Sequence, residues 1–104
     1  MTWKLWLDDQ LDDPHQPQRQ VPEGFLGARS TKEAVELLRK HGPPSFMDLD
    51  HDLGRDDRAI DFLHWLYEMF PNGPVPEYNV HSENPVSWGN ITSYLESWKR
   101  SLAL

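Results

Sequence analysis

The sequence predicts an α/β fold: a small three-layer open parallel sheet of about four strands, with helices on both faces. Short strand-like apolar segments alternate along the chain with segments whose apolar residues recur at helical spacing. This alternation favours a parallel sheet with right-handed crossovers. The first strand-like segment is apolar at nearly every position, which is typical of a strand buried on both faces. A chain of 104 residues can bury one core, so we expect a single domain over residues 1–104.

In the first half of the chain, residues 3–7 form an apolar run that predicts a strand and ends at a pair of aspartates. Residues 10–24 contain three prolines and several glutamines, so we expect an irregular loop there. Residues 25–28 are a candidate strand. A helix follows from residue 30, where a Ser and a Glu three positions apart form a capping box.

The second half repeats the alternation. Residues 45–49 predict a strand, and residues 59–70 predict a largely apolar helix that a Pro-Asn-Gly-Pro run ends. Residues 77–82 predict the fourth strand. The last helix begins at the Asn-Pro pair of residues 84–85 and carries one apolar stripe.

Charge and composition exclude several classes of protein. The formal net charge is −7 and there is no cysteine. A general DNA-binding protein presents a basic face to phosphates, which this acidic chain does not predict. The lack of cysteine excludes disulfides and thiolate metal sites. Because no apolar stretch approaches the roughly 18–20 residues of a membrane span, we expect a cytoplasmic protein with no membrane partner.

Polar motifs directly follow three of the predicted strands: Asp8-Asp9, Asp50-His51-Asp52, and the run from His81 to Asn84. Each motif alone also fits an exposed turn, a capped loop or a strand end. Open parallel sheets, however, bind ligands in the crevice outside the carboxyl ends of their strands. The convergence of all three motifs on that edge favours a functional site.

The residue types in these motifs suit phosphoester chemistry. Clustered carboxylates hold a divalent cation or raise one another's pKa, and two histidines could act as general base and general acid near neutral pH. The helix that begins at Asn84 would offer free backbone N–H groups to an anion. Arg55 could contact a phosphate, although a solvated loop position is the simpler interpretation.

The motifs resemble the receiver domains of two-component signalling, in which an acidic pair binds magnesium and an Asp after the third strand is phosphorylated. The chain lacks their fifth strand and the Lys that follows it. A closer resemblance is to the receiver-like family proposed to process cyclic phosphates, whose motifs here are Trp6-Leu7-Asp8-Asp9, Asp50-His51-Asp52-Leu53-Gly54, Trp65 and His81-Ser82-Glu83-Asn84-Pro85. The resemblance spans nearly the whole chain. The sequence departs from that pattern at Leu11, where an Arg is common, and at Ser87, where a Gly is expected.

This resemblance implies a phosphodiesterase that opens a cyclic phosphate on a nucleotide or an RNA end. The activated water and the protonated leaving oxygen would need a base and an acid, and His51 and His81 are the candidates, with neither role assigned. Mg²⁺ or Mn²⁺ would balance an acidic site against an anionic substrate. The expected site residues are His51, His81, Asp50 and Asp8 for catalysis, Ser82, Asn84 and Arg55 for substrate binding, and Asp9 and Asp52, with Asp8 and Asp50, for the metal.

Two alternatives come from other classes of protein. The first is a non-catalytic, receiver-type module that senses phosphate, against which the missing Lys counts. The second is an acidic interaction or inhibitor domain that binds a basic surface of a protein partner, which the small size and the charge of −7 allow.

Overall fold

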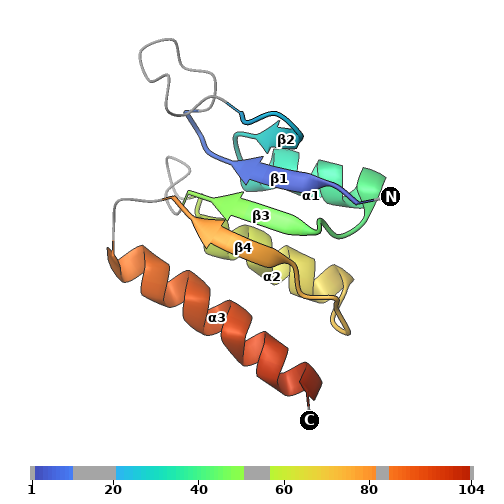
Figure 1. The fold of residues 1–104 in the computed structure, drawn as a ribbon, viewed down its shortest axis with the longest axis vertical. Coiled ribbons are helices and arrows are strands. Elements are labelled where there is room, and N and C mark those ends of the chain that lie inside the picture. The colour runs from blue at the N-terminus through green and yellow to red at the C-terminus, as the bar shows by residue number, and fades with distance from the viewer. Residues whose placement is uncertain (1, 11–20, 51–56, 82–84, 104) are drawn as a thin grey trace.

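The computed structural model describes residues 2–10, 21–50, 57–81 and 85–103 (Figure 1). Within this part of the chain, four strands form one sheet in the order β2-β1-β3-β4, and every neighbouring pair is parallel. The strands are β1 (Lys4–Leu7), β2 (Phe25–Ala28), β3 (Phe46–Leu49) and β4 (Glu77–Val80), and the helices are α1 (Thr31–His41), α2 (Ala59–Met69) and α3 (Pro85–Ala103).

The observed elements confirm the α/β class and the receiver-like parallel sheet that the sequence predicts. The predicted cap of α1 is present, because the Ser30 hydroxyl accepts a hydrogen bond from the backbone N–H of Glu33 at 3.2 Å. The helix ends at Gly42, whose positive φ of 78° suits a residue without a side chain. No described helix is long and apolar enough to cross a membrane.

The core lies on one face of the sheet. Alternate strand residues, including Leu5, Leu7, Met47 and Leu49, form one buried cluster with residues of all three described helices. Val80 belongs to the same cluster, as do Phe62 of α2 and the α3 residues Ile91, Leu95 and Trp98. In Figure 1, α1 and α2 lie behind the sheet and α3 runs beside β4.

The layering therefore differs from the prediction of helices on both faces. On the opposite face, Trp6, Asp48 and Asn79 lie in register across β1, β3 and β4, and none of the described helices contributes to their side of the sheet. Trp6 is instead covered partly by ring contacts, among them an edge-to-face contact with Phe25. The polar residues at alternate strand positions explain the difference, because a helix packed over Asp48 and Asn79 would have to bury them.

Candidate active site

Three of the predicted site residues lie one position beyond their strands and are held by the sheet itself. The backbone N–H of Asp8 donates to the carbonyl of Ala28 at 3.0 Å, that of Asp50 to Leu7 at 2.8 Å, and that of His81 to Leu49 at 2.9 Å. Each bond extends the parallel ladder by one residue past the last paired position. The backbones of β1, β3 and β4 thus fix where these side chains begin.

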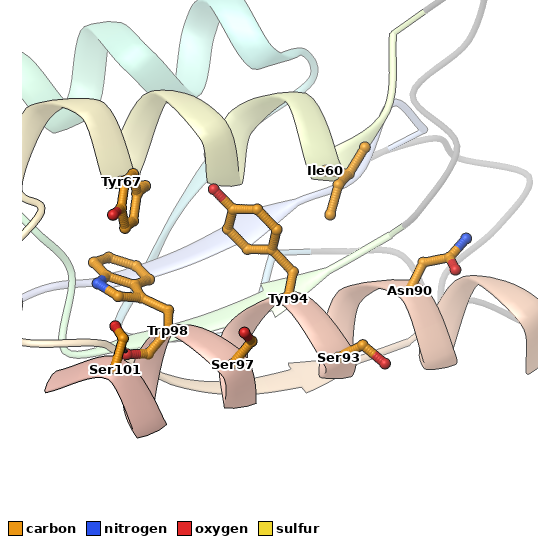
Figure 2. Close-up of a pocket in the computed structure, with 8 residues that line it drawn as sticks. All are labelled: Ile60, Tyr67, Asn90, Ser93, Tyr94, Ser97, Trp98 and Ser101. Atoms are coloured by element: carbon orange, nitrogen blue, oxygen red, sulfur yellow. Dashed lines mark hydrogen bonds between the residues drawn. The ribbon is translucent and has the colours of Figure 1, made fainter. Parts of the chain in front are cut away.

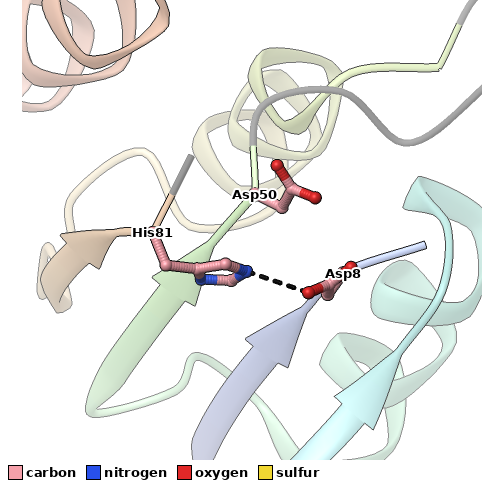
Figure 3. A group of neighbouring side chains, drawn as sticks. All are labelled: Asp8, Asp50 and His81. Atoms are coloured by element: carbon pink, nitrogen blue, oxygen red, sulfur yellow. Dashed lines mark hydrogen bonds and ion pairs between the residues drawn. The ribbon is translucent and has the colours of Figure 1, made fainter. Parts of the chain in front are cut away.

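The side chains of Asp8, Asp50 and His81 meet at this edge (Figure 3). One ligand atom from each lies within 4.8 Å of the others. Asp8 is fully buried and Asp50 is 6% exposed, which is unusual for carboxylates unless they are paired. The Nε2 atom of His81 is 3.2 Å from Oδ2 of Asp8, and the other oxygen of Asp8 accepts the backbone N–H of Gln10 at 2.8 Å.

Asp48 is a third carboxylate of the site, and it was not among the site residues expected from the sequence. Its Oδ1 lies 2.6 Å from Nδ1 of His81, so a carboxylate faces each ring nitrogen of the histidine. The amide of Asn79, in register with Asp48 on β4, donates to both oxygens at 3.4 Å. A charged residue between the buried Met47 and Leu49 was the available signal, because a strand rarely places such a residue in its interior without a partner.

Trp6 stacks on the flat face of the same His81 imidazole ring. The indole and imidazole rings are stacked, with centroids 4.3 Å apart and planes 3° from parallel. Asp48, Asp8 and Trp6 together leave the His81 ring little freedom to rotate. The sequence showed Trp6 as part of an apolar strand and of the motif Trp6-Leu7-Asp8-Asp9, but its partner 75 positions away could not be predicted from local pattern.

The pKa of His81 is raised above its ordinary value of 6.5. Burial alone lowers this pKa, but the hydrogen bond to Asp48 and the negative charges of Asp48, Asp50 and Asp8 outweigh the cost of burial. The site therefore favours the imidazolium form, in which both ring nitrogens donate.

The donor set also fits a divalent cation. Two carboxylates and one imidazole converge at Asp8, Asp50 and His81, and carboxylate oxygens are the ligands that Mg²⁺ and Mn²⁺ accept. A metal bound through His81 would need the ring in its neutral form. When His81 is charged, the cation would therefore be held by Asp8 and Asp50 without the imidazole.

The structure brings together only some of the residues expected from the sequence. Asp8, Asp50 and His81 form the cluster, whereas Asp9 is half-buried and is not a member of this three-residue group. The other expected site residues, His51, Asp52, Arg55, Ser82 and Asn84, lie outside the described part of the chain.

A groove of about 550 Å³ lies elsewhere, between α2 and α3 (Figure 2). It is lined by Ile60, Tyr67, Asn90, Ser93, Tyr94, Ser97, Trp98 and Ser101. This lining contains no carboxylate and no histidine, so it offers no acid–base pair near neutral pH. Among the described residues, the clustered carboxylates and His81 lie at the strand ends and not in this groove.

A family model described as the cyclic-phosphate processing receiver domain matches residues 3–97. The match includes the strands that carry Asp8, Asp48, Asp50 and His81. Comparison with curated proteins gives no match, and comparison with solved structures gives none either.

Proposed function

Because the chain belongs to the cyclic-phosphate processing receiver domain family, we propose that it is a phosphodiesterase that opens a cyclic phosphate on a nucleotide or an RNA end. The observation that carries this proposal is the position of His81, whose two ring nitrogens face Asp48 and Asp8 at the strand-end cluster; these carboxylates raise its pKa. A positioned imidazolium is a proton donor suited to neutral pH.

Ring opening consumes one water molecule. The water oxygen bonds to phosphorus, the bond from phosphorus to one sugar oxygen breaks, and that oxygen takes a proton. One proton of the water passes to a base, the other stays on the new phosphate oxygen until that oxygen ionises, and the product is a phosphate monoester. His81 would protonate the leaving oxygen, because its environment favours the charged ring. His51, the other histidine of the sequence motifs, is the candidate base.

Mg²⁺ or Mn²⁺ is the proposed cofactor. Asp8 and Asp50 would hold it, with Asp9 and Asp52 as the further candidates from the sequence. When bound, the ion would offset the negative charge that builds up on the phosphate oxygens. The chain's own contribution would be to hold the two carboxylates at fixed positions and to favour the charged form of His81. Ser82, Asn84 and Arg55 are the proposed contacts to the substrate.

A substrate screen tests the proposal. Nucleoside 2′,3′-cyclic and 3′,5′-cyclic phosphates, and RNA with a 2′,3′-cyclic end, are incubated with the protein with and without Mg²⁺ or Mn²⁺, and phosphorus NMR follows the monoester. We expect turnover of at least one substrate class. His81→Ala should lower its rate by about 10²- to 10⁴-fold, the usual contribution of one positioned acid or base.

His41→Ala is the matched control, because His41 is an exposed histidine in the last turn of α1. It should keep the wild-type rate. Equal losses in both variants would place the proton transfer elsewhere. Tight binding of a cyclic phosphate by the wild type without any turnover would instead favour a receiver-type module that senses phosphate.

A further inference from the structure

The described tryptophans with buried side chains differ in how they satisfy their indole N–H groups. Trp3 and Trp98, which are 8% and 3% exposed, donate to the carbonyls of Gly42 at 2.9 Å and Pro71 at 3.1 Å. Trp6 is also 8% exposed, but its buried Nε1 atom has no hydrogen-bond acceptor among the residues that the structure describes.

A buried donor without an acceptor is costly, and native proteins seldom keep one without a reason. The fold gives the other buried tryptophans an acceptor from the backbone. Trp6 is thus the exception among the buried tryptophans that the structure describes, and its indole stacks on His81 of the candidate active site. An acceptor supplied by a ligand would remove the cost.

The ring geometry places this donor beside His81. The indole plane is within 3° of the imidazole plane and the centroids are 4.3 Å apart. Because an indole N–H points outward in the plane of its ring, the donor runs parallel to the imidazole and does not point into its face. The Nε1 atom is itself buried, so a ligand atom at the edge of His81 would reach it once the atoms that cover it move aside.

We propose that Trp6 binds the substrate, with its indole N–H donating to a phosphate oxygen of the group that reacts beside His81. This inference rests on the proposed function and adds a binding residue to it. The acceptor is a phosphate oxygen because the proposed substrate brings one to this site. Asp8, Asp48 and Asp50 already supply negative charge, so a phosphate needs donors there, and the indole N–H supplies one.

The indole region of a ¹H–¹⁵N NMR spectrum tests the inference without requiring turnover. The five tryptophans give five indole resonances, and Trp6→Phe identifies the one that belongs to Trp6. Inorganic phosphate and a nucleoside 2′,3′-cyclic phosphate are titrated separately. We expect the Trp6 proton to move downfield as its hydrogen bond forms. The Trp3 and Trp98 protons should stay in place, because each already has a protein acceptor.

Two variants measure what the donor contributes to binding. Trp6→Phe keeps an aromatic ring against His81 and removes the N–H, so the KM for a cyclic phosphate should rise roughly 10- to 100-fold, as expected for a lost hydrogen bond to a charged acceptor. Benzothienylalanine introduced at position 6 keeps the shape of indole with sulfur in place of N–H and should give the same rise. Trp3→Phe, the matched control, should leave KM unchanged.

The outcomes separate this inference from the proposed function. A fixed Trp6 resonance in a protein that hydrolyses cyclic phosphates would overturn the inference and leave the function standing. That result would mean that the Trp6 N–H interacts with the Phe25 ring, which contacts the indole edge-to-face, and not with a ligand. A Trp6 shift with phosphate in a protein that hydrolyses no cyclic phosphate would support the inference and overturn the phosphodiesterase.

Discussion

Nδ1 of His81 lies 2.6 Å from Oδ1 of Asp48, although the two residues are 33 positions apart in the chain. Asp48 belongs to β3, and His81 follows the last residue of β4. The contact turns a histidine at a strand end back over the face of the sheet, where Trp6 stacks on its ring. Asp48 thus sets both the charge and the orientation of the imidazole.

Replacing Asp48 should lower the pKa of His81. Asp48→Asn keeps the shape of the side chain but removes the carboxylate that raises this pKa through a hydrogen bond and a charge. An NMR titration of the His81 ring protons measures the change. Glu77→Gln, an exposed position on β4, is the control and should leave the titration unchanged. An unaltered pKa in Asp48→Asn would contradict the assigned cause.

The stability of the protein should depend on pH through His81. Its pKa is higher in the folded protein than the ordinary value of 6.5. The stabilising contribution of the charged ring is therefore fully present below about pH 6.5 and is lost as the pH rises through the folded pKa. Urea denaturation at a series of pH values gives the free energy of unfolding of the wild type and of His81→Gln. The difference in free energy of unfolding between the wild type and His81→Gln should shrink across that pH window. A difference that grows with pH would contradict a stabilising role for the ion pairs of His81 with Asp8 and Asp48.

Divalent cations should stabilise the protein through the aspartate pair. Mg²⁺ or Mn²⁺ that binds the folded state raises the melting temperature by mass action, and Asp50→Asn should lose the response because one of the two buried carboxylates is gone. Glu68→Gln removes a carboxylate on α2, away from the strand ends, and should keep the response. Equal shifts in all three proteins would mean that the ions bind elsewhere.

Truncating a core side chain to Ala should lower the free energy of unfolding far more than truncating a side chain on the edge strand of the sheet. Phe62 of α2 is fully buried against the sheet, so Phe62→Ala should lower the free energy of unfolding by about 3–5 kcal/mol. Leu26 on the edge strand β2 is 39% exposed, and Leu26→Ala should cost much less. Denaturant titrations compare the two variants, and similar losses would contradict the described packing.

The strand ends were predictable because apolar runs stop abruptly at acids. Residues 3–7 end at Asp8, and residues 45–49 end at Asp50, so the edge on which these side chains meet followed from the parallel order alone. Local pattern could not reveal which strands would be neighbours. The contact between His81 and Asp48 depends on the register of β3 and β4 and not on any spacing within one segment.

The one-sided burial of the sheet was harder to infer. Trp6 made the first strand look apolar on both faces, and the alternating polar positions were visible only when three separate strands were compared. Lys4, Asp48 and Asn79 all belong to the face opposite the core. A search for period-two polarity in these three strands together would have indicated a sheet with one helix-covered face.

The order of the strands divides the site between the centre of the sheet and its rim. Asp8 and Asp50 follow β1 and β3, which have strand neighbours on both sides. His81 follows β4, which pairs only with β3 among the strands that the structure describes. Amide hydrogen exchange should therefore be faster along β4 than along β1. Local opening of this rim strand would separate His81 from its carboxylates while Asp8 and Asp50 stayed assembled, so the proposed proton donor can be lost without the proposed cation-binding pair.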